Sequence, residues 1–136
     1  MMAPFVYEEA RANAPLHAQL VRYDLTAPQA DTSSIRATGR VLRIFRNQGG
    51  LLHLGWKISF FIPTNGGEEA PMLDGTIRLN PGYLYQSRFW EGFFEFWNGE
   101  FHLVHSQIAP IRRPTWRPVC SPDVKGFLFE GNCREK

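Results

Sequence analysis

The most regular pattern in the sequence is a run in which every second side chain is apolar. Residues 52–62, LHLGWKISFFI, place apolar groups at Leu52, Leu54, Trp56, Ile58, Phe60 and Ile62. Successive side chains of a β-strand point to opposite faces of a sheet, so this run predicts a strand with one buried face. The same alternation assigns Trp56 to the core.

The composition favours strands and turns over long helices. A chain of 136 residues corresponds to one domain and can bury a core without metal or disulfide support. Aromatic residues make up 14% of the chain, which also contains twelve Gly and ten Pro. We therefore expect an all-β, mainly antiparallel fold.

Three further segments carry strand signals, at residues 35–46, 75–80 and 88–108. The first, IRATGRVLRIFR, has apolar groups on both faces, which a bulge at Gly39 would explain. The last contains Asn98-Gly99, the strongest short signal for a type I′ hairpin turn. The register of such a hairpin pairs Glu95 with His102. It also pairs Gly92 with His105, whose side chain is expected to be buried in the core.

The ends of the chain are less regular than its middle. Residues 1–34 predict an N-terminal extension with a short helix at 8–14, a possible strand at 16–25 and a loop. Residues 35–110 are expected to form the β core. Residues 111–136 are expected to form a tail, in which prolines exclude a regular helix.

The sequence GRVLRIFR-NQGG-LLHLGWKISFFI resembles the opening pair of strands of the OB-fold family. The resemblance covers about residues 35–110 and is carried by the strand pattern, without a signature motif. It implies a small five-stranded barrel and binding of oligonucleotides or oligosaccharides on the face of its second and third strands. A β-sandwich or a cupped sheet remain alternatives.

Basic residues concentrate in one part of a chain whose net charge is only +2. Between Thr32 and Gly67 there is no Asp or Glu, and that segment is locally +5. Arginine neutralises phosphate and an exposed aromatic ring stacks on bases, which predicts an anion-binding or nucleic-acid-binding strand. Its candidate residues are Arg40, Arg43, Arg46, Lys57 and Phe61, together with Arg36. The alternative is a solvated face that pairs with acids on neighbouring strands.

Two other groups of residues are candidate sites of chemistry. Glu95 opposite His102 is the beginning of a general acid–base unit, and the alternative is a cross-strand ion pair. His102 and His105 lie on opposite faces of a strand, and no His-x-His or Cys-x-x-Cys motif is present, so no metal or cofactor is expected.

The segment RRPTWRP interleaves Arg and Trp with Pro, which is typical of an extended segment that docks on a partner. Its candidate contact residues are Arg112, Arg113, Trp116 and Arg117. The alternative is that Trp116 folds back and covers one end of the barrel.

The expected function is a non-catalytic binding or interaction module for single-stranded nucleic acid, another anionic ligand or a protein. A small-barrel enzyme and a structural subunit that forms homodimers are the alternatives. The N-terminal residues lack the pattern of a secretory signal, and no run is long enough to span a membrane. A cytoplasmic protein with Cys120 and Cys133 as free thiols is therefore expected.

Overall fold

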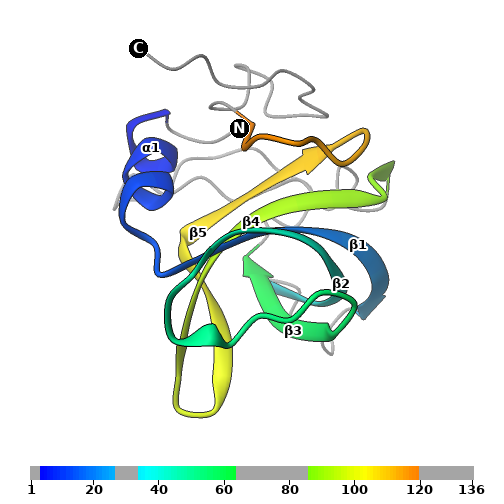
Figure 1. Ribbon diagram of the computed structural model, residues 1–136. Helices are drawn as coiled ribbons and strands as arrows, with labels where there is room; N and C mark the ends of the chain where they lie inside the picture. The colour runs from blue at the N-terminus through cyan, green and yellow to red at the C-terminus, as the bar shows by residue number, and fades with distance from the viewer. Residues whose placement is uncertain (1–3, 27–33, 64–85, 120–136) are drawn as a thin grey trace.

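The computed structural model describes residues 4–26, 34–63 and 86–119 (Figure 1). In chain order, its elements are α1 (Pro4–Asn13), β1 (Leu16–Thr26), β2 (Ser34–Asn47), η1 (Gln48–Gly50), β3 (Lys57–Pro63), β4 (Phe89–Trp97) and β5 (Glu100–Ile111). The predicted strand at 75–80 and both cysteines lie outside these residues. None of the described helices is long and apolar enough to cross a membrane.

The five strands form one antiparallel sheet in the order β3-β2-β1-β4-β5, as expected for an all-β chain. The sheet curves into a cup (Figure 1), and no hydrogen-bonded ladder joins the described edge strands β3 and β5. The cupped-sheet alternative therefore describes the architecture. The central strand is β1, although it belongs to the segment that the sequence assigned to an N-terminal extension.

The inner face of the cup holds the main hydrophobic core. Leu20, Trp90 and Phe94 are fully buried there. The ring of Phe60 on the edge strand β3 lies 4.9 Å from that of Phe94, edge to face, which brings β3 against β4 across the cup. The cup is thus closed by aromatic side chains where backbone pairing stops.

The irregularities of the β1–β2 ladder occur at other positions than expected. Leu42 and Phe45 are the extra residues in β2, whereas the bulge beside Gly39 has its extra residue, Tyr23, in β1. Gly39 instead permits β2 to approach the Leu20 side chain of β1 closely, because a Cβ at this position would lie 2.9 Å from the Cβ of Leu20. Each extra residue changes which side chains reach each face.

The alternating run 52–62 forms a strand only from Lys57 onward. Gly55 has φ +83° and lies in a turn, so the residues before it leave the sheet. Ile58, Phe60 and Ile62 are buried, as the alternation predicts. The assignment of Trp56 to the core is wrong: its side chain is 62% exposed and packs against His53.

The β4–β5 hairpin has the predicted turn, with φ of 53° at Asn98 and 77° at Gly99. Its register matches the prediction as far as Phe94 and Leu103, and then shifts so that Gly92 pairs with Ile108. The predicted Gly92–His105 pair and the buried His105 are therefore wrong. His105 has φ 52°, and its imidazole is half exposed, 3.5 Å from Glu9.

Candidate nucleic-acid interface

The outer face of β2 and β3 carries cations and one aromatic ring in register. Arg36 and Arg40 are exposed on β2, where they alternate with the buried Ala37 and Gly39. Across the ladder, Arg36 pairs with Phe61, and Arg40 pairs with Lys57. The pleat of the two strands therefore places three positive charges and an exposed ring on one surface.

Tyr23 adds a second aromatic ring to this surface. It is the bulged residue of β1, and its side chain is 59% exposed. Lys57 Nζ lies 4.1 Å from the centre of the ring, and Arg40 Cζ lies 5.8 Å from it. These are cation–π distances, so the tyrosine orders the two cations while part of its surface stays in solvent.

Among the described residues, the cations of this surface form no close ion pair. Within the described ranges, no carboxylate lies within 4 Å of Arg36, Arg40 or Lys57. Arg40 Nη1 instead donates to the backbone oxygen of Gly55, at 2.8 Å. We call Tyr23, Arg36, Arg40, Lys57 and Phe61 the basic face.

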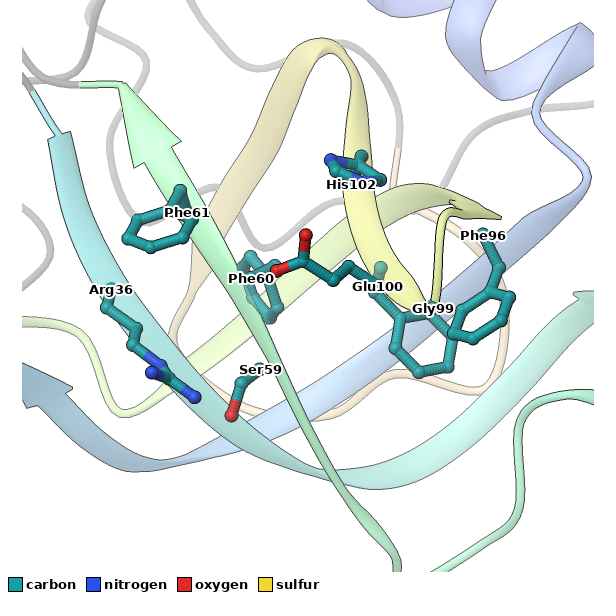
Figure 2. Close-up of a pocket in the computed structure, with 9 residues that line it drawn as sticks. Arg36, Ser59, Phe60, Phe61, Phe96, Gly99, Glu100 and His102 are labelled. Atoms are coloured by element: carbon teal, nitrogen blue, oxygen red, sulfur yellow. The ribbon is translucent and has the colours of Figure 1, made fainter.

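A cleft of about 360 Å³ adjoins the basic face where the sheet is open (Figure 2). Arg36, Ser59 and Phe61 line it from β2 and β3, and Glu100 and His102 line it from the tip of the hairpin. The buried ring of Phe60 and the rings of Phe96 and Phe101 supply apolar lining. A planar ligand in this cleft, next to the basic face, would contact both apolar and polar side chains.

The predicted acid–base pair has the expected register, because Glu95 is opposite His102. The His102 ring, however, stacks on Trp97 with centroids 3.9 Å apart, and its Nε2 lies 3.3 Å from the Trp97 backbone oxygen. Within the described part of the chain, the ring and polar contacts of this imidazole are thus with Trp97. Nothing in this geometry singles out Glu95 as a catalytic group.

The predicted ligand-binding residues fall into two groups. Arg40, Lys57 and Phe61 lie together on the basic face. Arg43 is stacked against Trp116, with its guanidinium carbon 4.1 Å from the ring centre. Arg46 lies at the other end of β2, where its Nη1 donates to the Ala14 backbone oxygen at 2.7 Å. The bulges in β2 separate these two arginines from the others.

The four tail residues proposed for protein contact are all exposed: Arg112, Arg113, Trp116 and Arg117. The alternative, in which Trp116 covers an end of the barrel, is wrong, because this side chain is 83% exposed. The segment that contains Trp116 is nevertheless hydrogen-bonded to the sheet. The backbone N–H of Thr115 donates to Gln19 Oε1 at 2.8 Å, and Gln19 Nε2 donates to Thr115 Oγ1 at 2.7 Å.

A buried polar network lies under that segment and was not foreseen. Glu91 is fully buried and accepts hydrogen bonds from Gln19 Nε2 at 2.7 Å and from the Val119 backbone N–H at 3.1 Å. Its Oε2 lies 2.8 Å from Nε2 of His17, which is 2% exposed. The available signal was the alternation of His17 and Gln19 with apolar residues in LHAQL.

Searches for relatives give no family assignment: no protein-family model matches the sequence, and no curated protein matches it significantly. Among the described residues, no group of three or more His, Cys, Asp or Glu side chains is arranged to hold a metal ion. The chemistry of the basic face and of the buried network must therefore be argued from their own geometry.

Proposed function

We propose that this protein is a non-catalytic module that binds single-stranded nucleic acid on its basic face. The observation that carries the proposal is the exposure of Tyr23 and Phe61, at 59% and 51%, on the surface that also presents three cations. Exposed rings beside cations are the combination that single-strand binders use, because bases stack while phosphates are neutralised.

The spacing of the face suits an extended strand of nucleic acid. Arg36 and Arg40 are four residues apart on β2, and Lys57 and Phe61 are four apart on β3. At about 3.3 Å per residue, each pair spans about 13 Å along the sheet. Cations and rings are thus distributed along the face instead of gathering at one point, as a polymeric anion requires.

The topology supports the same proposal. The described strand order β3-β2-β1-β4-β5 and the contact between β3 and β4 form a cupped, partly open sheet, which is compatible with an extended ligand on its outer face. OB-folds are partly open five-stranded barrels that bind oligonucleotides on the face of strands 2 and 3. The basic face lies mainly on β2 and β3, although the sequence resemblance assigns these two segments to the first and second strands of such a barrel.

Fluorescence anisotropy with a labelled single-stranded oligonucleotide tests the proposal. One variant, R36Q/R40Q/K57Q, removes the charges of the basic face, and a second, Y23A/F61A, removes its rings. The matched control is R112Q/R113Q/R117Q, which removes three positive charges from the tail. Base–aromatic stacking contributes about 1–3 kcal/mol per base, so the ring variant should bind at least about fivefold more weakly.

The charge variant should lose most of the binding, and the tail control should bind as the parent chain does. Equal losses in the charge variant and in the tail control would mean that only net charge matters, and would refute the assignment to the basic face. Absence of binding by the parent chain would refute nucleic-acid binding itself.

A further inference from the structure

We propose a second binding site, in which Arg11, Arg46 and His17 bind the phosphate or carboxylate group of a small ligand. The site is a cavity of about 360 Å³ lined by Glu8, Arg11, Ala12, His17, Phe45 and Arg46. It lies between α1 and the paired ends of β1 and β2. It shares no residue with the basic face, so its existence does not depend on nucleic-acid binding.

The innermost polar group of the cavity is an imidazole held in a fixed orientation. His17 is 2% exposed, and its ring packs against Phe93 and Phe45 with centroids 4.3 and 5.0 Å apart. Its Nε2 is occupied by Glu91, and a carboxylate only accepts, so Nε2 carries a hydrogen. Nδ1 then remains for a ligand: it donates to a carboxylate or phosphate oxygen when the ring is an imidazolium, whereas in the neutral ring it accepts only from a protonated phosphate oxygen.

The carboxylate behind His17 is itself fully satisfied. Glu91 has no exposed surface and receives hydrogen bonds from Gln19 and from the Val119 backbone besides that of His17. These contacts hold the carboxylate in the interior of the protein. His17 is therefore positioned before any ligand arrives, which lowers the entropy lost on binding.

Two arginines supply the positive charge. Arg46 uses Nη1 to bind the Ala14 backbone oxygen, and that bond fixes the guanidinium while its other N–H groups remain. Arg11 lies in the last turn of α1 and, like Arg46, is partly buried. Guanidinium groups match the planar geometry of carboxylate and phosphate oxygens, with two parallel hydrogen bonds.

The remaining lining residues indicate which chemical groups the ligand has besides its anionic group. Glu8 is the only carboxylate among the described lining residues, and it is exposed, where solvent and salt screen its charge. Phe45 contributes an apolar wall. The cavity volume lies at the lower end of the range for small-molecule sites, so it accommodates an anionic group attached to a small apolar body.

Titrations with inorganic phosphate and with acetate, at constant ionic strength maintained with sodium chloride, test the site. The readout is the NMR signals of the His17 ring and of the arginine side chains. Variants R11Q and R46Q each remove one cation, and R117Q, at an exposed arginine outside both sites, is the matched control. A charge-assisted hydrogen bond is strong enough that either loss should raise Kd at least about tenfold.

Saturable shifts of His17 with phosphate or acetate, weakened in R11Q and R46Q and unchanged in R117Q, support the site and identify the preferred oxyanion. E8Q should lower Kd, because it removes the opposing charge. Shifts that do not saturate, or that equal those produced by chloride, would overturn the proposal. Unchanged Kd values in R11Q would also overturn it. This variant should fold even if R46Q is unstable, because Arg11 lies on α1, outside the sheet.

Discussion

The Glu91 carboxylate lies 2.8 Å from the His17 imidazole, and both side chains are removed from solvent. The two residues are 74 positions apart in the chain and lie on the neighbouring strands β1 and β4. The same carboxylate receives the backbone N–H of Val119. One side chain therefore connects the centre of the sheet with the segment that follows β5.

Replacing Glu91 with Ala should destabilise the fold by about 3 kcal/mol, because removing one member of a buried pair leaves its partners without an acceptor. Those partners are His17, Gln19 and the Val119 backbone. Urea denaturation followed by circular dichroism measures the loss.

The control for this variant is Glu95→Ala, two residues along the same strand and only partly buried. It should change the free energy of unfolding by no more than about 0.5 kcal/mol, as is usual at the surface. Equal losses in the two variants would contradict a structural role for the Glu91 network.

Gly92 is predicted to be intolerant of any side chain. A Cβ at this position would lie 2.6 Å from Cζ of Phe94, whose ring is fully buried and packs against Phe60. Gly92→Ala should therefore cost about 2 kcal/mol, the range observed for overpacked cores.

A double-mutant cycle separates this clash from a backbone effect. In a Phe94→Leu background the ring is absent, so Gly92→Ala should cost at least about 1 kcal/mol less than in the parent chain. Thermal or urea unfolding of the parent chain, the two single variants and the double variant gives the coupling free energy between the two positions. A cost that is the same in both backgrounds would show that the ring is not the cause.

The hairpin turn depends on the left-handed backbone of Asn98, at φ 53°. Asn98→Ala should destabilise the fold by about 1 kcal/mol, since a side chain that makes no local hydrogen bond is disfavoured in this region. Asn98→Gly should be tolerated within about 0.5 kcal/mol. If the two substitutions had the same effect on the urea midpoint, the turn conformation would not be what stabilises the hairpin.

Local pattern was sufficient to predict the elements whose geometry is local. The Asn98-Gly99 turn sets the register as far as Phe94 and Leu103, and the alternation around Phe60 identifies the buried face of β3. Both depend on neighbours in the chain. The antiparallel all-β class follows from the same signals.

What the sequence did not reveal depends on contacts between distant segments. Trp56 continues an apolar alternation but is exposed, because the turn at Gly55 removes it from the strand. Glu91 appears in the sequence as one acid on a half-solvated face, whereas its buried contacts are with the distant residues His17, Gln19 and Val119. Arg43 and Arg46 were grouped with Arg40 because the bulges between them have no local signature.

The measurement that tests the central proposal most directly is the salt dependence of single-strand binding. For single strands, the logarithm of affinity falls with the logarithm of salt concentration by about 0.7 per neutralised phosphate. Three contacts, from Arg36, Arg40 and Lys57, predict a slope of about −2, or an affinity loss of about 20-fold between about 50 and 200 mM salt.

Neutralising Lys57 alone, as K57Q, should make that slope shallower by about 0.7, while R117Q should leave it unchanged. Binding with the predicted slope and this selective response would support recognition by the basic face. Absence of binding at about 50 mM salt, or a slope that K57Q and R117Q alter equally, would contradict it.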